Sequence, residues 1–262
     1  MQRLVSLSVL AAFLWPQWAS AELRPHRAEY SLRLGPAANA LRIGSAMSDL
    51  AADCSGWKIR RDINTEIAIT PSWKIAVSSK LEGEEERGGG AFRYRATQIQ
   101  NGQERRTEGR VQRTPKETRA EITGPTGPAQ TTMPAATMMP ISALAYLVDR
   151  LKAGALSFPA LMFDAEVITD SFLVEVETVD RGTLRAARPA DRQVAIPDGK
   201  SFPVSLSFTR GARQDQKPLF TVTGLVWDTG VLDLLTVDTG LVSVTADLQT
   251  LEMRTIPNCP RS

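Results

Sequence analysis

The chain has 262 residues, nearly balanced charge (31 Lys and Arg against 29 Asp and Glu) and 42% hydrophobic residues. A net charge of +2 argues against nucleic acid as a main partner. The single histidine, His26, cannot by itself build a Ser-His-Asp, Cys-His or multi-histidine metal site. We therefore expect no catalytic residues, no metal site and no cofactor.

The first 21 residues have the form of a secretory signal peptide. Arg3 supplies a short positive start, residues 4–15 are apolar but too few to span a bilayer, and Ala19-Ser20-Ala21 resembles a signal-peptidase site. We expect cleavage between Ala21 and Glu22, which leaves an exported, single β domain over residues 22–262. An uncleaved membrane anchor is the alternative.

Alternation of apolar and polar residues predicts β-strands along most of the mature chain. In HRAEYSLRL (26–34), every second residue from Ala28 to Leu34 is apolar. Acidic and glycine clusters at 83–86 and 88–90 are interpreted as connections between strands. Other strand-like segments are 56–70, 72–83, 91–100, 105–113, 171–179, 202–210, 218–227, 231–237 and 241–253. About a dozen strands without βαβ alternation indicate a mainly antiparallel β fold.

A basic stretch within this region alternates with carboxylates, which is typical of the solvated face of edge strands. Its cations are Arg105, Arg106, Arg110, Arg113, Lys116 and Arg119, interleaved with Glu104, Glu108 and Glu117.

A proline-rich break at residues 123–140 reads as an extended connection. The next segment, 140–154, predicts the one helix, because Pro140 suits a first turn and Gly154 is placed to end it. Residues with helical spacing form an apolar face that can be buried against a sheet: Ile141, Leu144, Ala145, Val148 and Leu151.

Two cysteines, Cys54 and Cys259, lie in the exported part of the chain. In an oxidising compartment such a pair is most simply a disulfide, here closing a loop of about 206 residues. Loop-closure entropy gives such a bond about 5 kcal/mol, although measured values are more often about 2–4 kcal/mol. A redox pair is the alternative, but the chain has no C-x-x-C spacing and shows no helix N-terminus beside either thiol.

The tripeptide Asp-Thr-Gly, which marks aspartic proteases, occurs at 228–230 and 238–240. A protease needs its two carboxylates about 3 Å apart. The strand-like segment between Asp228 and Asp238 would hold them about 23 Å apart, so they cannot form a dyad within one chain. The protein lacks the downstream apolar-apolar-Gly element of dimeric proteases, and we interpret both tripeptides as turns.

Several aromatic residues lie in strand-like segments, and we expect them to form core. A hydrophobic groove for a lipid or acyl chain is the alternative role. They are Tyr30, Trp57, Trp73, Phe158, Phe163, Phe172, Phe220 and Trp227.

Five segments in this order resemble the envelope-integrity protein B (EipB) family of Gram-negative periplasms, a domain of unknown function. The segments are HRAEYSLRL, DCSGW, TMMPISALAYLVDRLKAG, MFD and DTGLVSVTADLQTLEMRTIPNC. Two positions depart from the family pattern: Ala165 stands where glycine is usual, and Thr239 where an aromatic residue is usual. These departures leave any function of the two turns in question.

The resemblance implies a spiral-like, broken-barrel antiparallel sheet wrapped around one amphipathic helix, with a disulfide that matches Cys54 and Cys259. It also implies a non-enzymatic protein that supports cell envelope integrity under stress. Its expected partners are periplasmic or envelope proteins, including a repeat-containing envelope protein as one candidate. A periplasmic carrier that binds a lipid or lipoprotein acyl chain in its curved sheet remains the alternative.

Overall fold

The computed structural model describes residues 23–70, 73–188, 198–211 and 217–259. The expected cleavage site between Ala21 and Glu22 lies outside these residues. The first eight strands are β1 (His26–Leu34), β2 (Arg42–Ala52), β3 (Gly56–Thr70), β4 (Trp73–Glu86), β5 (Ala91–Gln100), β6 (Gln103–Arg113), β7 (Glu117–Gly124) and β8 (Gly127–Pro134). Helix α1 (Pro140–Lys152) follows, and then β9 (Ser157–Asp164), β10 (Asp170–Thr178), the short 3-10 helix η1 (Arg181–Thr183), β11 (Ser201–Arg210), β12 (Phe220–Trp227), β13 (Leu232–Asp238) and β14 (Ser243–Met253).

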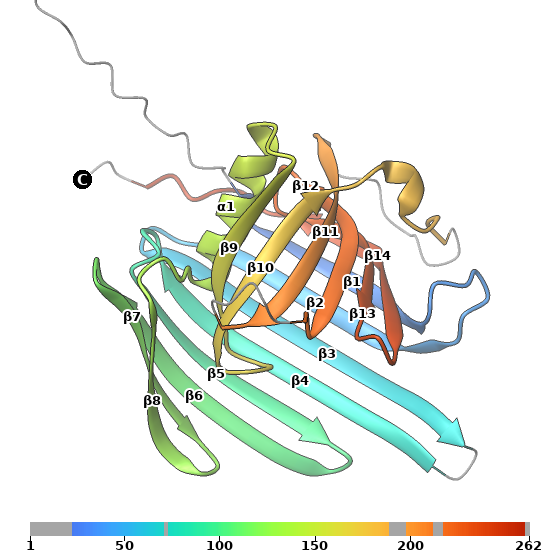
Figure 1. Cartoon of the computed structure of the whole chain (residues 1–262), viewed down its shortest axis with the longest axis horizontal. Helices are drawn as coiled ribbons and strands as arrows, with labels where there is room; N and C mark the ends of the chain where they lie inside the picture. Colours follow the sequence, from blue (N-terminus) through green and yellow to red (C-terminus); the bar gives the residue numbers. More distant parts are fainter. Residues whose placement is uncertain (1–22, 71–72, 189–197, 212–216, 260–262) are drawn as a thin grey trace, which may run out of the picture.

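All 14 strands belong to one sheet, in the order β8-β7-β6-β5-β4-β3-β2-β1-β14-β13-β12-β11-β10-β9, and every neighbouring pair is antiparallel. The sheet curls so that β9–β13 lie in front of the longer strands β2–β4, with α1 at one end (Figure 1). Its two edges, β8 and β9, do not pair as strands. At this seam Met138 forms a parallel bridge to Met162, donating to the carbonyl of Leu161 and accepting from the N–H of Phe163. The expected broken barrel around a helix is confirmed.

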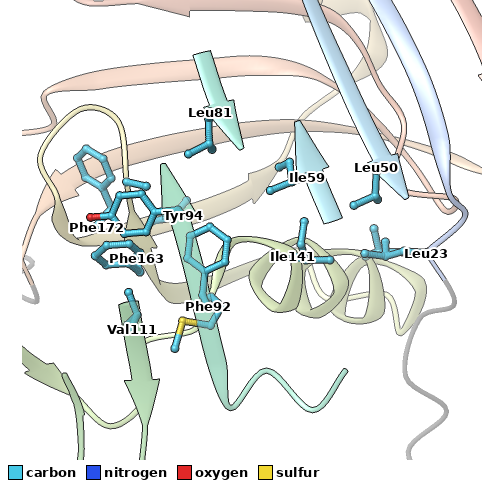
Figure 2. Packing of buried hydrophobic residues seen from close by; sticks show 14 of the residues in the cluster. Leu23, Leu50, Ile59, Leu81, Phe92, Tyr94, Val111, Ile141, Phe163 and Phe172 are labelled. Atoms are coloured by element: carbon cyan, nitrogen blue, oxygen red, sulfur yellow. The ribbon is translucent and has the colours of Figure 1, made fainter. Parts of the chain in front are cut away.

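The main core fills the space between the two halves of the curled sheet and α1. Phe92, Phe163 and Phe172 are completely or almost completely buried, and Phe163 contacts both Phe92 and Tyr94 through its ring. Figure 2 shows Ile141 of the helix beside Leu50 and Ile59 of the sheet. A smaller cluster around Tyr30, Trp227 and Leu248 fills the space under β1 and β14.

The aromatic residues therefore form core rather than line a groove. Tyr30, Phe158, Phe163, Phe172 and Trp227 are at most 7% exposed. Trp57 and Phe220 are partly buried and pack against the main core, whereas the side chain of Trp73 lies outside the described part.

Much of the proline-rich segment forms strand β8 rather than an extended connection, which corrects the prediction. Residues 124–127 form a hairpin turn, and β8 then pairs with β7 from Gly127 to Pro134. Proline lacks the N–H that a central strand must donate, but β8 is a sheet edge, where one side of the backbone has no strand to pair with. Pro128 and Pro134 are therefore tolerated.

The acidic cluster at 83–86 also differs from the prediction, because it forms the end of β4 instead of a connection. Gly83 lies under the ring of Phe92, where a Cβ would come within 2.5 Å of a ring carbon. Glu85, two residues later on the same face, points toward the start of α1 and is 2% exposed. Both residues thus serve packing inside the barrel, and the true connection is the glycine run at 88–90.

Helix α1 begins and ends where the sequence predicts, with Pro140 in its first turn and Gly154 at φ +82° after its end. Its cap comes from outside the helix. The Glu85 carboxylate accepts hydrogen bonds from the N–H groups of Ile141 (2.7 Å) and Ser142 (2.8 Å) and from the Ser142 hydroxyl. Burial raises the pKa of Glu85 despite these hydrogen bonds.

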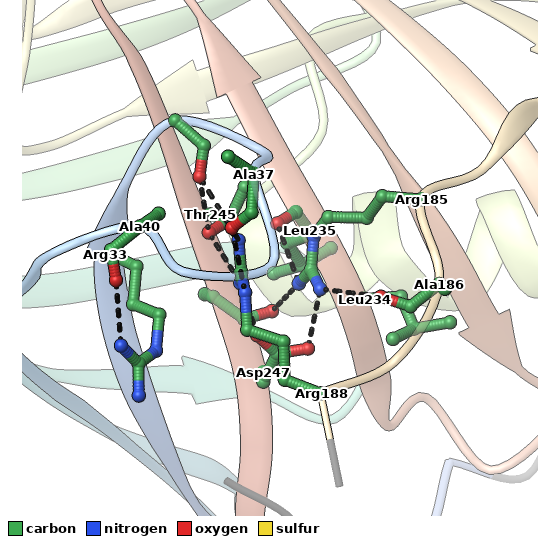
Figure 3. Close-up of polar contacts among 12 residues, drawn as sticks. Arg33, Ala37, Ala40, Arg185, Ala186, Arg188, Leu234, Leu235, Thr245 and Asp247 are labelled. Atoms are coloured by element: carbon green, nitrogen blue, oxygen red, sulfur yellow. Dashed lines mark hydrogen bonds and ion pairs between the residues drawn. The ribbon is translucent and has the colours of Figure 1, made fainter. Parts of the chain in front are cut away.

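A buried ionic network fixes the segment after η1 to the outside of β14 (Figure 3). Asp247 pairs with Arg185 at 2.6 Å and with Arg188 at 2.7 Å, and all three side chains are at most 7% exposed. Arg188 also donates to the hydroxyl of Thr245 and to the carbonyls of Gly35 and Ala37. One strand thus holds the β10–β11 connection and the β1–β2 loop together.

Candidate functional site

The outer face of the sheet carries a row of alternating charges across seven strands. The strand register places opposite charges side by side in the order Glu252 (β14), Arg27 (β1), Asp49 (β2), Arg60 (β3), Glu82 (β4), Arg95 (β5) and Glu108 (β6). Asp49 is half-buried and the other six residues are exposed. Of the neighbouring pairs, Arg95 and Glu108 form an ion pair at 2.7 Å. We call these residues the charge row.

Two open cavities lie along the charge row. One, of about 480 Å³, includes Arg27, Arg42, Asp49 and Arg60 in its lining. The other, of about 530 Å³, includes Lys58, Arg93, Arg95 and Arg254. Both are lined mainly by charged and polar side chains, so their chemistry suits a charged partner better than an apolar ligand.

The basic stretch from Arg105 to Arg119 follows on β6 and β7, where strand alternation places Arg106, Arg110 and Arg119 on the face of the charge row and Arg105 and Arg113 on the opposite face. Its six cations are exposed, as predicted for a solvated face. Arg106 pairs with Glu104, and Arg119 pairs with Glu117. Exposed pairs of this kind contribute about 0–1 kcal/mol each to stability, so they add little to folding.

The disulfide between Cys54 and Cys259 borders the charge row. It joins the β2–β3 turn to the segment after β14, with Cα atoms 5.4 Å apart and a sequence separation of 205. Arg254, five residues before Cys259, holds both carboxylate oxygens of Asp49 at 2.5 and 2.9 Å. The expected disulfide is present, and it lies beside the outer face of the sheet.

The turn that carries Cys54 is ordered by Asp53. One carboxylate oxygen of Asp53 accepts hydrogen bonds from the N–H groups of Ser55 (2.9 Å) and Gly56 (3.1 Å) and from the Ser55 hydroxyl (2.5 Å). These hydrogen bonds, chiefly the one from the Ser55 hydroxyl, lower the pKa of Asp53 below its usual range. These hydrogen bonds stabilise the β2–β3 turn independently of the disulfide.

The loop after the MFD segment folds inward and closes the core from the side opposite the helix. The Glu166 carboxylate pairs with Arg61 at 2.5 Å and accepts from the Ser79 hydroxyl at 2.9 Å, and its carbonyl accepts from Gln98 at 2.6 Å. Asp164 caps the same loop through the N–H groups of residues 167 and 168. The loop is therefore tied to three strands of the other half of the sheet.

The two departures from the family pattern are accommodated without strain. Ala165 is 5% exposed within the core, and the described non-glycine residues with positive φ are Asn101, Thr169 and Leu234, so position 165 requires no glycine. Thr239 closes the β13–β14 turn, because its hydroxyl donates to the carbonyl of Val242 and accepts from the N–H of the same residue. Both replacements suit a structural role.

The Asp-Thr-Gly tripeptides are turns at opposite ends of β13, as predicted. Asp228 accepts from the N–H of Lys200, and Asp238 accepts from the N–H of Gly240. His26 opens β1, also as predicted, and its Nδ1 donates to the carbonyl of Arg24. Asp228, Asp238 and His26 therefore each form a hydrogen bond with the backbone.

Within the described ranges, no cluster of three or more His, Cys, Asp or Glu side chains could hold a metal ion. Over the same ranges, no helix has the length and apolar character needed to cross a membrane.

The model of the EipB-like family matches residues 17–255. A crystal structure of a beta-barrel-like protein of a domain of unknown function from Brucella abortus is similar, with a TM-score of 0.77 and 17% identity over 89% of this chain and 99% of that chain. At that identity the likeness concerns the fold alone. Among curated proteins, none matches this chain. Because the family model spans most of its length, the chain belongs to the EipB-like family.

Proposed function

We propose that this is a non-enzymatic periplasmic protein that supports cell envelope integrity under stress by binding other envelope proteins. The family and the long-range disulfide fit an exported envelope protein. The observation that carries the interaction role is the charge row, because alternating charges held in a fixed register on an exposed sheet face give orientation and specificity to a protein partner.

The interior supports this proposal over a carrier role. Its largest fully buried side chains are Phe92, Phe163 and Phe172, packed against one another or against neighbouring rings. The loop with Glu166 further restricts access to this space from the end opposite α1. Binding is therefore assigned to the outer face.

One feature favours the carrier as a second candidate. Strands β3 and β4 continue beyond the loop with Glu166, and Ile67, Ile75 and Val77 share the face that lines the interior farther along the strands. These side chains are half-buried, and neither core cluster includes them. An acyl chain would find an apolar surface there.

The test of the proposed function is complementation of a deletion strain under envelope stress, such as detergent or a cell-wall antibiotic. The wild-type gene should restore growth, and the double charge reversal Arg60→Glu/Arg95→Glu should fail to do so at equal periplasmic level and equal melting temperature. Lys152→Glu, at the end of α1 and away from the charge row, is the matched control and should restore growth. Full rescue by the charge-row variant would refute the assignment of function to this face.

A further inference from the structure

The two cysteines of the Cys54–Cys259 disulfide differ in their exposure to solvent. Cys54 is exposed, whereas Cys259 is half-buried. Reduction of a disulfide begins when a thiolate attacks one sulfur and expels the other, so access helps to select the sulfur attacked. Cys54 is therefore the electrophile, and Cys259 is the leaving group.

A cation lies where the leaving thiolate would form. Nη2 of Arg87, from the β4–β5 turn, is 3.5 Å from the sulfur of Cys259. The same nitrogen donates to the carbonyl of Asp53 at 3.0 Å, and the backbone N–H of Arg87 donates to Ser55 at 3.1 Å. A neighbouring guanidinium stabilises a thiolate, and a thiol with a lower pKa leaves faster.

Both partners of the disulfide are anchored independently of the bond. Cys54 lies in the turn that Asp53 holds with three hydrogen bonds. On the other side, Arg254 is fixed by Asp49 and by a hydrogen bond from its N–H to the carbonyl of Pro25 at 2.8 Å. Reduction would therefore release the short segment 255–259 from the turn and leave the strands in place.

We propose that Cys54–Cys259 is a thiol–disulfide exchange site for a dithiol oxidoreductase of the thioredoxin type. A thiolate of the reductant bonds to Sγ of Cys54 as the S–S bond breaks, and the electron pair of that bond goes to Cys259, which leaves as a thiolate. The second thiolate of the reductant then attacks the reductant's first sulfur in the mixed disulfide, and Cys54 leaves as a thiolate. The reductant ends as a disulfide, and the protein has gained two electrons and two protons.

This inference goes beyond the proposed interaction with envelope proteins and does not depend on it. The sequence disfavours a redox pair because neither cysteine has a C-x-x-C partner or a helix N-terminus. In the folded protein, Arg87 supplies the positive charge that those arrangements would otherwise provide. The exchange site is visible only once the β4–β5 turn is placed beside the C-terminal segment.

The test uses the oxidised mature protein and a thioredoxin in which the resolving cysteine is replaced by serine, so that the mixed disulfide accumulates. Peptide mapping by mass spectrometry should find the thioredoxin on Cys54. In parallel, the rate of reduction by dithiothreitol is measured for the wild type and for Arg87→Gln. The rate should fall about threefold or more in Arg87→Gln, because a leaving thiol that loses its neighbouring positive charge leaves more slowly.

Two variants make the rate measurement specific. Arg87→Lys keeps the charge and should retain most of the rate, whereas Arg210→Gln removes an exposed charge at the end of β11 and should leave the rate unchanged. A mixed disulfide on Cys259 would overturn the proposal. So would equal rates in Arg87→Gln and Arg210→Gln, or reduction that proceeds only as fast as global unfolding. If Arg87→Gln does not fold, the Arg87→Lys rate and the position of the mixed disulfide decide.

Discussion

Removing the charge of Asp247 should destabilise the protein strongly, because two buried arginines depend on that one carboxylate. Arg185 and Arg188 approach opposite oxygens of Asp247 at 2.6 and 2.7 Å, and each arginine side chain is 7% exposed. In Asp247→Asn the amide oxygen can accept from one arginine, while its NH₂ group faces the other. Breaking a buried ion pair from one side costs about 3–5 kcal/mol, since it leaves uncompensated buried charge.

The assay is urea denaturation of the oxidised protein, followed by tryptophan fluorescence and circular dichroism. We expect the free energy of unfolding to fall by about 3–5 kcal/mol in Asp247→Asn. Asp238→Asn is the matched control, because Asp238 is exposed and the amide oxygen of the new Asn can still accept from the N–H of Gly240. The free energy of unfolding should therefore fall by less than about 1 kcal/mol in this variant.

A triple variant separates charge from packing. Replacing all three members of the network, as Arg185→Met/Arg188→Met/Asp247→Leu, removes the uncompensated charge and should recover part of the stability lost in Asp247→Asn. The reasoning would be refuted if Asp247→Asn behaved like Asp238→Asn, or if the triple variant were less stable than Asp247→Asn.

Four further variants probe the disulfide, the helix cap and the core. Cys54→Ser should lower the free energy of unfolding by about 2–4 kcal/mol relative to the oxidised wild type. An unchanged melting temperature without reductant would contradict a stabilising role of the disulfide. Glu85→Ala should cost about 2–4 kcal/mol, because it removes the cap of α1 and leaves buried N–H groups without an acceptor; a loss under 0.5 kcal/mol in urea titration would show that water replaces it. Burial raises the pKa of Glu85 above 4.5, so its contribution is full below that pH and is lost as pH rises through the folded-state pKa. The stability of wild type relative to Glu85→Gln should therefore increase from pH 7 toward pH 5, and a constant difference would contradict the raised pKa. Phe163→Ala should cost about 3–5 kcal/mol in the same titration, and a cost near 1 kcal/mol would mean that the interior is loosely packed.

The fold class, the helix and the strongly alternating strands could be predicted from local sequence, because each depends on a pattern within a few residues. β2 was missed, since its apolar residues are mostly small and many of its positions are half-buried. β7–β9 were missed for other reasons. β8 has prolines that only an edge strand tolerates, and whether a strand is an edge depends on distant partners.

The candidate site could be predicted only in part. The cysteine pair follows from composition and compartment, but the position of Arg87 beside Cys259 depends on two segments separated by 172 residues. The charge row likewise depends on the register of seven strands, including the pairing of β1 with β14. Glu85 was grouped with exposed acidic neighbours, because nothing in the local sequence shows that α1 begins beside it.

The measurement that tests the central claim most directly is a native mass spectrum of the protein exported to a periplasm and purified without detergent or reductant. If the core is filled and function lies on the outer face, the mass should correspond to residues 22–262 minus two hydrogens, with no adduct. A retained adduct in the mass range of lipids would contradict this account and would place a ligand-binding surface on the inner face of β3 and β4.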